Sequence, residues 1–216
     1  MLSQEEILAN KNEFLSLVNS IKRDGMRLDD LLDYLENSDF FYAPASTKYH
    51  AAYEGGLCEH CLNVYYNLVT LLNTKQNLDV YCRDEDSIKI VALFHDISKV
   101  NIYEKTSKNV KVYGKPFECK QQDELGYFRW VAQVGYKTKD KKFLYGNHEV
   151  TSEYIIRQYI PLTIDESVAI LHHMGSLGHD SAPDDIAGVY TQYQLALFLH
   201  FADMIATYVD ERMLDE

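Results

Sequence analysis

The sequence has little of what marks secreted or membrane-bound proteins. Its 216 residues include only four cysteines, too few and too irregularly spaced for a disulfide framework. The N-terminal residues, MLSQEEILANKNEF, have neither a basic start nor an apolar stretch of signal length, and no later apolar run is long enough to span a bilayer. We therefore expect a reduced, cytoplasmic protein that does not engage a membrane.

Basic residues are also scarce. The chain has 21 Lys and Arg against 33 Asp and Glu, a net charge of −12, which argues against a surface built as a platform for long nucleic acid. The exception runs from Lys99 to Lys142, where eleven basic residues outnumber five acidic ones, a local balance of +6. This excess can draw an anion to one end of the molecule, or it can belong to a solvated, Lys-rich loop or hairpin.

The remaining composition is that of one globular domain. Hydrophobic residues at 46% and charged residues at 25% are ordinary values, and 216 residues can bury a core without disulfides. There is no internal repeat and no linker of low complexity. We predict one domain over residues 1–216, with an N-terminal helical extension over 1–44 and a basic insert over 100–147.

Helical periodicity runs through most of the chain. Apolar residues recur at helical spacing in 3–22, 28–35, 57–72, 88–94, 148–160, 164–174 and from about 190 onward. Asp86 or Ser87 can cap the fourth of these helices, and residues 163–166 match a capping box. Alternating and aromatic runs within 100–147 predict a hairpin or an irregular insert, and residues 178–188 are typical of a polar loop.

The stretch IVALFHDISK, which begins at Ile90, carries the strongest chemical signal. Its apolar helix ends abruptly in His95 and Asp96, and a core helix gains nothing from these groups. A neutral imidazole and a carboxylate are both good ligands for a divalent transition metal. Two ligands do not make a site, but His60 and Asp203 lie on other apolar segments with helical periodicity.

Taken singly, each of these residues is more often a helix cap or a satisfied core histidine than a metal ligand. They occur together here in the order H...HD...D, as His60, His95, Asp96 and Asp203. This pattern resembles the signature of the HD superfamily of metal-dependent phosphohydrolases. The flanks agree, since GGL precedes the first histidine, HDISK matches the common HD-x-[GS]-K, and an alanine precedes the last aspartate. The resemblance spans roughly residues 45–207.

The resemblance implies an all-α, HD-domain-like helical bundle with a small irregular or β-hairpin insert near the site. It also implies an enzyme that hydrolyses a phosphate ester or anhydride with metal-activated water. The expected substrate is a nucleotide, a nucleoside phosphate or a short oligonucleotide. We expect Asp96 and Lys99 to be catalytic, with Lys99 contacting a phosphate oxygen, although a lysine near a helix C-terminus is favourable for the helix dipole in any case.

A subset of this superfamily holds two metal ions, and its two further histidines match His148 and His173. Asn147 separates His148 from the preceding glycine, a slight departure from the subset, and His172 could substitute for His173. The alternative is that His148 caps a helix and His173 contacts phosphate. Asp96 would bridge two ions through its two oxygens, and a hydroxide between two cations is a nucleophile at neutral pH. This histidine-rich set favours iron, manganese, nickel, cobalt or zinc over magnesium.

Other interpretations stay open. Residues 45–60 resemble the HD domain of certain exoribonucleases, so a 3′–5′ exonuclease is one alternative, and His50 is expected to make a local or substrate contact rather than to bind metal. A metal-binding regulatory or ligand-sensing domain without turnover is another, and a purely structural helical protein is a third. Cys58 and Cys61 could indicate zinc or redox chemistry, but helix packing is favoured because no second pair follows. The sequence leaves the oligomeric state open.

Overall fold

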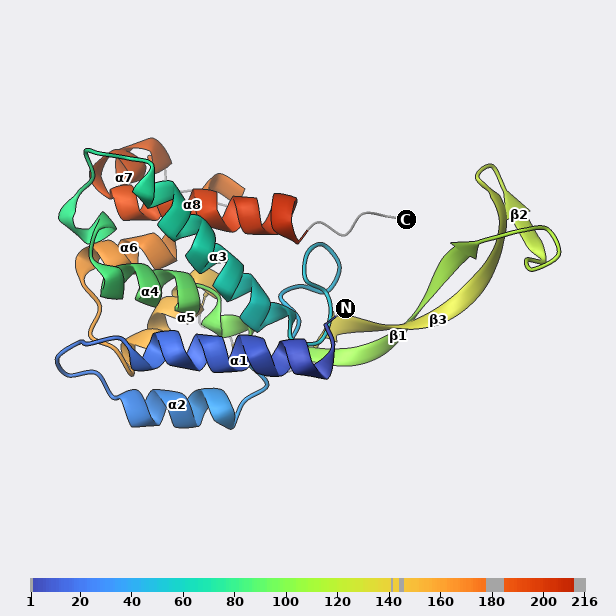
Figure 1. The fold of residues 1–216 in the computed structure, drawn as a ribbon, viewed down its shortest axis with the longest axis horizontal. Helices are drawn as coiled ribbons and strands as arrows, with labels where there is room; N and C mark the ends of the chain where they lie inside the picture. Colours follow the sequence, from blue (N-terminus) through green and yellow to red (C-terminus); the bar gives the residue numbers. More distant parts are fainter. Residues whose placement is uncertain (1, 141, 144–145, 178–184, 212–216) are drawn as a thin grey trace.

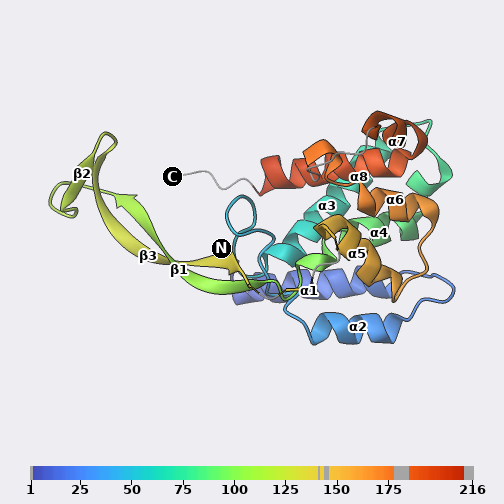
Figure 2. The same cartoon turned by 180° about the vertical axis from the view of Figure 1, so that it is seen from behind.

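The computed structural model describes residues 2–140, 142–143, 146–177 and 185–211. Within them the chain forms eight α-helices and a three-stranded antiparallel sheet (Figure 1). The helices gather into one body, from which a long hairpin extends (Figures 1 and 2). The helices are α1 (Gln4–Asn19), α2 (Leu28–Glu36), α3 (Gly56–Asn73), α4 (Glu85–Phe94), α5 (His148–Arg157), α6 (Ile164–Leu171), α7 (Ile186–Gln192) and α8 (Gln194–Ile205). None of these helices is long and apolar enough to cross a membrane.

The N-terminal helices pack directly on the rest of the body. Ser3 and Glu6 form the capping box of α1: Ser3 Oγ accepts from the Glu6 N–H at 3.2 Å, and the Glu6 carboxylate accepts from the Ser3 N–H at 2.7 Å. The buried ring of Phe14 lies 4.8 Å from Phe40 and 5.8 Å from Phe94, measured between ring centroids. The aromatic loop after α2 therefore fills the core, and the N-terminal extension shares that core with α4.

Helices α3 and α4 pack against each other, and α3 also packs against α8. The chain approaches α3 through a tight turn that requires glycine, because Gly55 has φ +85° and a Cβ on Gly56 would lie 2.1 Å from the carbonyl oxygen of Ala51. Helix α4 is buried from Ser87 to Phe94, which accounts for its apolar sequence. This packing directs the N-terminal part of α3 and the C-terminal end of α4 toward the same interior region.

Some helix boundaries follow capping chemistry that the sequence pattern did not locate. Helix α4 is capped by Asp84, whose Oδ1 accepts from the Asp86 N–H at 3.2 Å, so the cap lies before both residues predicted for it. The predicted final helix is divided into α7 and α8 because Tyr193 leaves the helical conformation, with φ −122° and ψ 85°. Of the polar loop predicted at 178–188, residues 178–184 lie outside the described residues.

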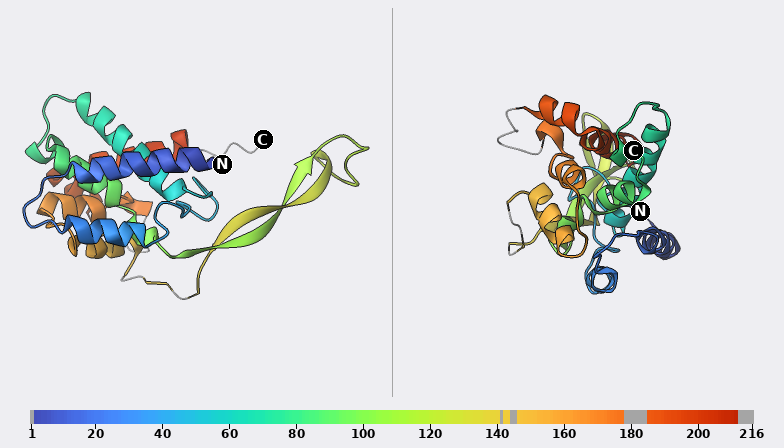
Figure 3. Two further views of the ribbon diagram at one scale, coloured as in Figure 1. Left: turned by 60° about the horizontal axis from the view of Figure 1, so that its bottom comes forward. Right: turned by 90° about the vertical axis from the view of Figure 1, so that its left-hand side faces the viewer.

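The insert predicted at 100–147 contains a hairpin that is larger than expected. Strand β1 (Tyr103–Tyr113) pairs antiparallel with β3 (Gly126–Thr138) along its whole length, and the short β2 (Gln121–Asp123) pairs with β3 near the tip. The hairpin twists as it leaves the helical body (Figure 3). The protein is therefore mostly helical with a small sheet, and the description all-α applies to the body alone.

Candidate metal centre

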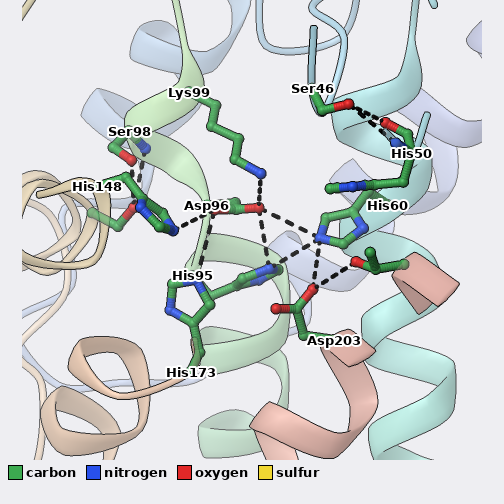
Figure 4. A network of polar contacts seen from close by, with 12 residues as sticks. Ser46, His50, His60, His95, Asp96, Ser98, Lys99, His148, His173 and Asp203 are labelled. Carbon is green, nitrogen blue, oxygen red and sulfur yellow. Dashed lines mark hydrogen bonds and ion pairs between the residues drawn. The ribbon is translucent and has the colours of Figure 1, made fainter. Parts of the chain in front are cut away.

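Side chains that are far apart in the sequence converge inside the helical body (Figure 4). His60 comes from α3, His95 and Asp96 from the end of α4, and Asp203 from α8. Nε2 of His60 lies 3.2 Å from Nε2 of His95 and 3.3 Å from Oδ1 of Asp203. Oδ2 of Asp96 lies 3.4 Å from Nε2 of both histidines. All four side chains are buried, and this group of histidines and aspartates could hold a metal ion.

Hydrogen bonds to the outer nitrogen fix the orientation of His60, of His95 and of a third buried histidine, His173, whose ring lies beside that of His95. In His95 and His173, Nδ1–H donates to the backbone carbonyl three residues earlier, at 2.9 and 2.7 Å. In His60, Nδ1 lies 3.1 Å from both carboxylate oxygens of Glu211. Because Nδ1 is the donor in each ring, the remaining nitrogen, Nε2, is the atom available to the cluster.

The contact between Nε2 of His60 and Nε2 of His95 tests whether a cation fits. Two neutral rings in this arrangement would turn lone pairs toward each other, so the contact requires a proton or a metal ion. Two nitrogens bound to one ion at about 2.0–2.1 Å lie roughly 3 Å apart when they are adjacent ligands. The observed 3.2 Å is therefore compatible with a shared divalent metal.

Asp96 divides the cluster into two sides. While Oδ2 faces the first two histidines, Oδ1 lies 3.8 Å from Nε2 of His173 and 3.9 Å from Nε2 of His148. Among the described residues, Asp96 Oδ1 and His173 Nε2 are buried polar atoms without a hydrogen-bond partner. Such atoms are rare in folded proteins, and a second cation on this side would bind both of them.

Burial and charge act against each other at Asp96 and His60. Burial opposes ionisation of Asp96, yet Lys99 and the neighbouring histidines hold its pKa well below the ordinary value. Burial also opposes protonation of His60, but the carboxylates of Glu211, Asp203 and Asp96 together hold its pKa well above the ordinary value. In this state a proton on His60 supplies positive charge that a metal ion could replace.

The histidines on the other side of Asp96 are held neutral. Burial, followed by the repulsion from His95, lowers the pKa of His173 to about 3. Burial likewise lowers the pKa of His148. A neutral imidazole is the form that binds a metal ion, so both rings are in the state that ligation needs.

The helix start at His148 explains the departure from the Gly-His pattern. Asn147 is the N-cap of α5, and its side-chain oxygen accepts from the Val150 N–H at 2.9 Å. His148 is therefore not the cap, and its ring is free to turn toward Asp96. Its Nδ1 lies 3.2 Å from Oε2 of Glu149, which leaves Nε2 on the side of the cluster.

The cluster also includes two buried carboxylates that the sequence analysis did not predict. Glu211 contacts His60, and Glu149 contacts His148. Among the described residues, the cluster contains the ammonium group of Lys99 and the carboxylates of Asp96, Glu149, Asp203 and Glu211. The carboxylates of Asp96, Asp203 and Glu211 lie around His60 and favour a bound cation there. The signal for Glu149 was its place directly after a candidate ligand, whereas Glu211 follows a π-helical turn at Ala206–Asp210 that the sequence did not reveal.

A cavity of about 220 Å³ opens onto the cluster. It is lined by Tyr49, His50, Asp96, Lys99, His148, Met174, His200, Asp203, Met204, Thr207 and Tyr208. Nζ of Lys99 lies 2.6 Å from Oδ2 of Asp96. Among the described residues, Nε2 of His50 is buried without a hydrogen-bond partner, and Ser46 Oγ holds the backbone of this residue through two hydrogen bonds. A small anion in the cavity would meet both a lysine and a histidine.

Other residues near the centre have structural roles. Ser152 Oγ donates to Ser98 Oγ at 2.9 Å and accepts from the Ser98 N–H at 3.2 Å, which ties the segment after Asp96 to α5. Cys58 and Cys61 are buried free thiols on α3. Both lie in the hydrophobic core, as the helix-packing interpretation predicts.

No protein-family model, curated protein or solved structure matches the chain. The protein is mostly helical, and its buried histidines and aspartates could bind a metal ion in an arrangement compatible with an HD-like motif.

Proposed function

We propose that the protein is a metal-dependent phosphohydrolase of the HD type, which cleaves a phosphate ester or anhydride in a nucleotide, a nucleoside phosphate or a short oligonucleotide. The 3.2 Å contact between the inward nitrogens of His60 and His95 is the observation that supports it most. The first ion would be held by His60, His95, Asp96 and Asp203, and a second by Asp96, His148 and His173. When bound, these ions would acidify a water molecule and neutralise charge on phosphoryl oxygens.

The chain's own residues would position the ligands and the substrate. Glu211 keeps the outer nitrogen of His60 occupied, so that Nε2 stays directed at the ion. Lys99 lines the cavity while it contacts Asp96, so its ammonium can also bind a phosphate oxygen. His50 presents Nε2 near the same cavity and would contact the substrate rather than the metal.

Metal content and turnover test this function. The protein is purified without chelator, its bound metals are measured by elemental analysis, and bis-p-nitrophenyl phosphate and a panel of nucleotides are assayed with added Mn²⁺. We expect stoichiometric transition metal and hydrolysis that a chelator abolishes. Metal without turnover of any phosphoester would favour a sensing domain, and activity confined to oligonucleotides would favour an exonuclease. Absence of bound metal after loading would overturn the proposal.

Two adjacent histidines provide a matched test of the second ion. His173 turns Nε2 toward Asp96, whereas His172 is the C-cap residue of α6. We expect His173→Ala to reduce bound metal from two ions to one per chain, and His172→Ala to leave the metal count unchanged. Equal metal content in the two variants would contradict the role of His173.

A further inference from the structure

The β1–β3 hairpin is an exposed ribbon whose two faces both meet solvent. Its strands pair from Tyr103 opposite Thr138 to Tyr113 opposite Phe128, a ladder on the order of 35 Å long. Of the residues in these two strands, only Phe128 is fully buried. A hairpin of this length normally buries one face against a core. The ribbon instead points away from the body, so packing does not explain its side chains (Figure 1).

The two faces of the ribbon differ in how their cations are neutralised. Alternate residues of a strand share a face, so Lys105 and Lys111 of β1 lie on one face together with the residues paired to them. There Lys105 contacts Glu54 at 2.8 Å, and Lys111 contacts Asp123 at the tip. We call the other face the basic face, and its distal half comprises Lys108, Val110, Val112, Tyr127, Arg129 and Val131.

Two cations of the basic face have no acidic partner in the part of the chain that the structure describes. Within the described residues, neither Lys108 nor Arg129 lies within ion-pair distance of a carboxylate, whereas Lys137 at the base of the same face contacts Glu104 at 2.9 Å. Between the two unpaired cations lie half-buried valines, and Tyr127 beside Arg129 is 37% exposed. The surface thus alternates cations with apolar and aromatic groups.

The charge of the ribbon contrasts with that of the whole chain. Residues 103–138 contain seven basic and four acidic residues, a balance of +3. Because the complete chain has a net charge of −12, the remainder carries −15. A polyanion would be repelled by the helical body and attracted to the ribbon. Two copies that met through their basic faces would bring like charges together, which disfavours pairing between ribbons.

We propose that the basic face of the hairpin binds single-stranded nucleic acid. Lys108 and Arg129 would contact phosphates, and bases would pack on Tyr127 and the neighbouring valines. Aromatic stacking combined with cations that follow the backbone is the general way in which proteins bind single strands without sequence preference. This binding does not require the metal centre, and the proposal is independent of hydrolysis.

Fluorescence anisotropy with the full chain tests the ribbon. The probes are labelled oligothymidylate and oligouridylate of about 20 nucleotides and a duplex of equal length, with a chelator present so that the metal centre does not contribute. We expect Lys108→Gln/Arg129→Gln to weaken single-strand binding by at least about tenfold. The salt dependence should also weaken: the negative slope of log affinity against log salt concentration should decrease in magnitude by roughly 1.4, because two phosphate contacts are lost. Tyr127→Ala should weaken binding by about fivefold or more.

A charge-matched control is Lys22→Gln/Lys75→Gln. These exposed lysines follow α1 and α3, at the ends of the helices that lie away from the hairpin in Figure 1. We expect this control to bind within about twofold of the wild type. Hydrolysis of bis-p-nitrophenyl phosphate should be equal in all variants, which separates this test from that of the proposed function.

Four results would overturn the proposal. They are failure of the wild type to bind either single strand, an equal loss in the control, tighter binding of the duplex, and a loss that accompanies dissociation of a dimer in sedimentation experiments. The last result would assign the ribbon to contact with a second copy of the chain instead.

Discussion

The helical body and the β hairpin treat charged groups in opposite ways. In the body, Asp96, Asp203 and Glu166 are almost fully buried, and each contacts a positive or hydrogen-bonding partner. On the basic face of the hairpin, Lys108 and Arg129 are exposed and have no acidic partner among the described residues. A buried charge without a partner raises the free energy of the folded state, whereas an exposed charge is stabilised by water and stays available to bind a ligand. In the helical body, a candidate site is therefore identified by the polar groups that contact one another. In the hairpin, it is identified by exposed cations that have no acidic partner among the described residues.

The largest expected effect is that of replacing Asp96, the buried carboxylate at the middle of the cluster in the helical body. Asp96→Ala removes the carboxylate that lies between the two sides of the cluster. We expect metal retention and hydrolysis to be abolished, with little change in helical circular dichroism because the alanine stays in the same helix-terminal segment. Elemental analysis, turnover and far-UV circular dichroism measure these outcomes. Unchanged metal content would count against the proposed centre.

The next effect compares one chemical change in the two regions. Glu166 is buried and contacts Arg23 at 2.6 Å, whereas Glu54 is partly exposed and contacts the exposed Lys105 of the hairpin at 2.8 Å. We expect Glu166→Gln to lower the free energy of unfolding by about 3 kcal/mol, because it removes the buried carboxylate of this ion pair and leaves the Arg23 guanidinium with a longer contact, 3.8 Å to Asp84.

Glu54→Gln is the matched change at the surface. It should alter the free energy of unfolding by less than about 1 kcal/mol, because an exposed ion pair is screened by solvent. Urea denaturation of both variants, followed by circular dichroism, gives the comparison. Similar losses in the two variants would show that the base of the hairpin is as strongly coupled to folding as the body.

A smaller effect is expected where a carboxylate acts through a histidine. Glu211→Ala removes the acceptor for Nδ1 of His60 and should lower metal affinity by about 10–100-fold. Glu211→Gln should recover most of that affinity, because its amide oxygen still accepts the hydrogen bond. Competition with a metal-binding dye measures both. If the two variants lose affinity equally, Glu211 contributes through charge and not through the orientation of His60.

Much of the helical body could be predicted from the sequence. The apolar spacing located α1, α2 and α3 within a few residues, and the capping box at Thr163 and Glu166 is present with both of its hydrogen bonds. These features depend on neighbours within one or two helical turns, so a linear pattern reveals them. The length of the hairpin was underestimated because alternation is confined to short runs such as residues 110–113, and the rest of the strands, exposed on both faces, lacks the pattern that identifies a half-buried strand.

The sequence predicted the candidate metal ligands of the site but not the side chains that orient them. The order of His60, His95, Asp96 and Asp203 was visible in the chain, because ligand chemistry belongs to the residue type. Glu211 was not, because it lies 151 positions from His60 and meets it only through the packing of α3 against the end of the chain.

Residue types and their order were thus sufficient to indicate helices, a histidine–aspartate set and a basic insert, since each is a local property of the chain. Which nitrogen of each ring faces the cluster, which oxygen of Asp96 meets which histidine, and which face of the hairpin keeps unpaired cations depend on distances between remote segments. Those distances arise when α3, α4, α5 and α8 pack together and when β1 pairs with β3 in one register. Long-range packing sets them because no short stretch of sequence encodes a separation in space.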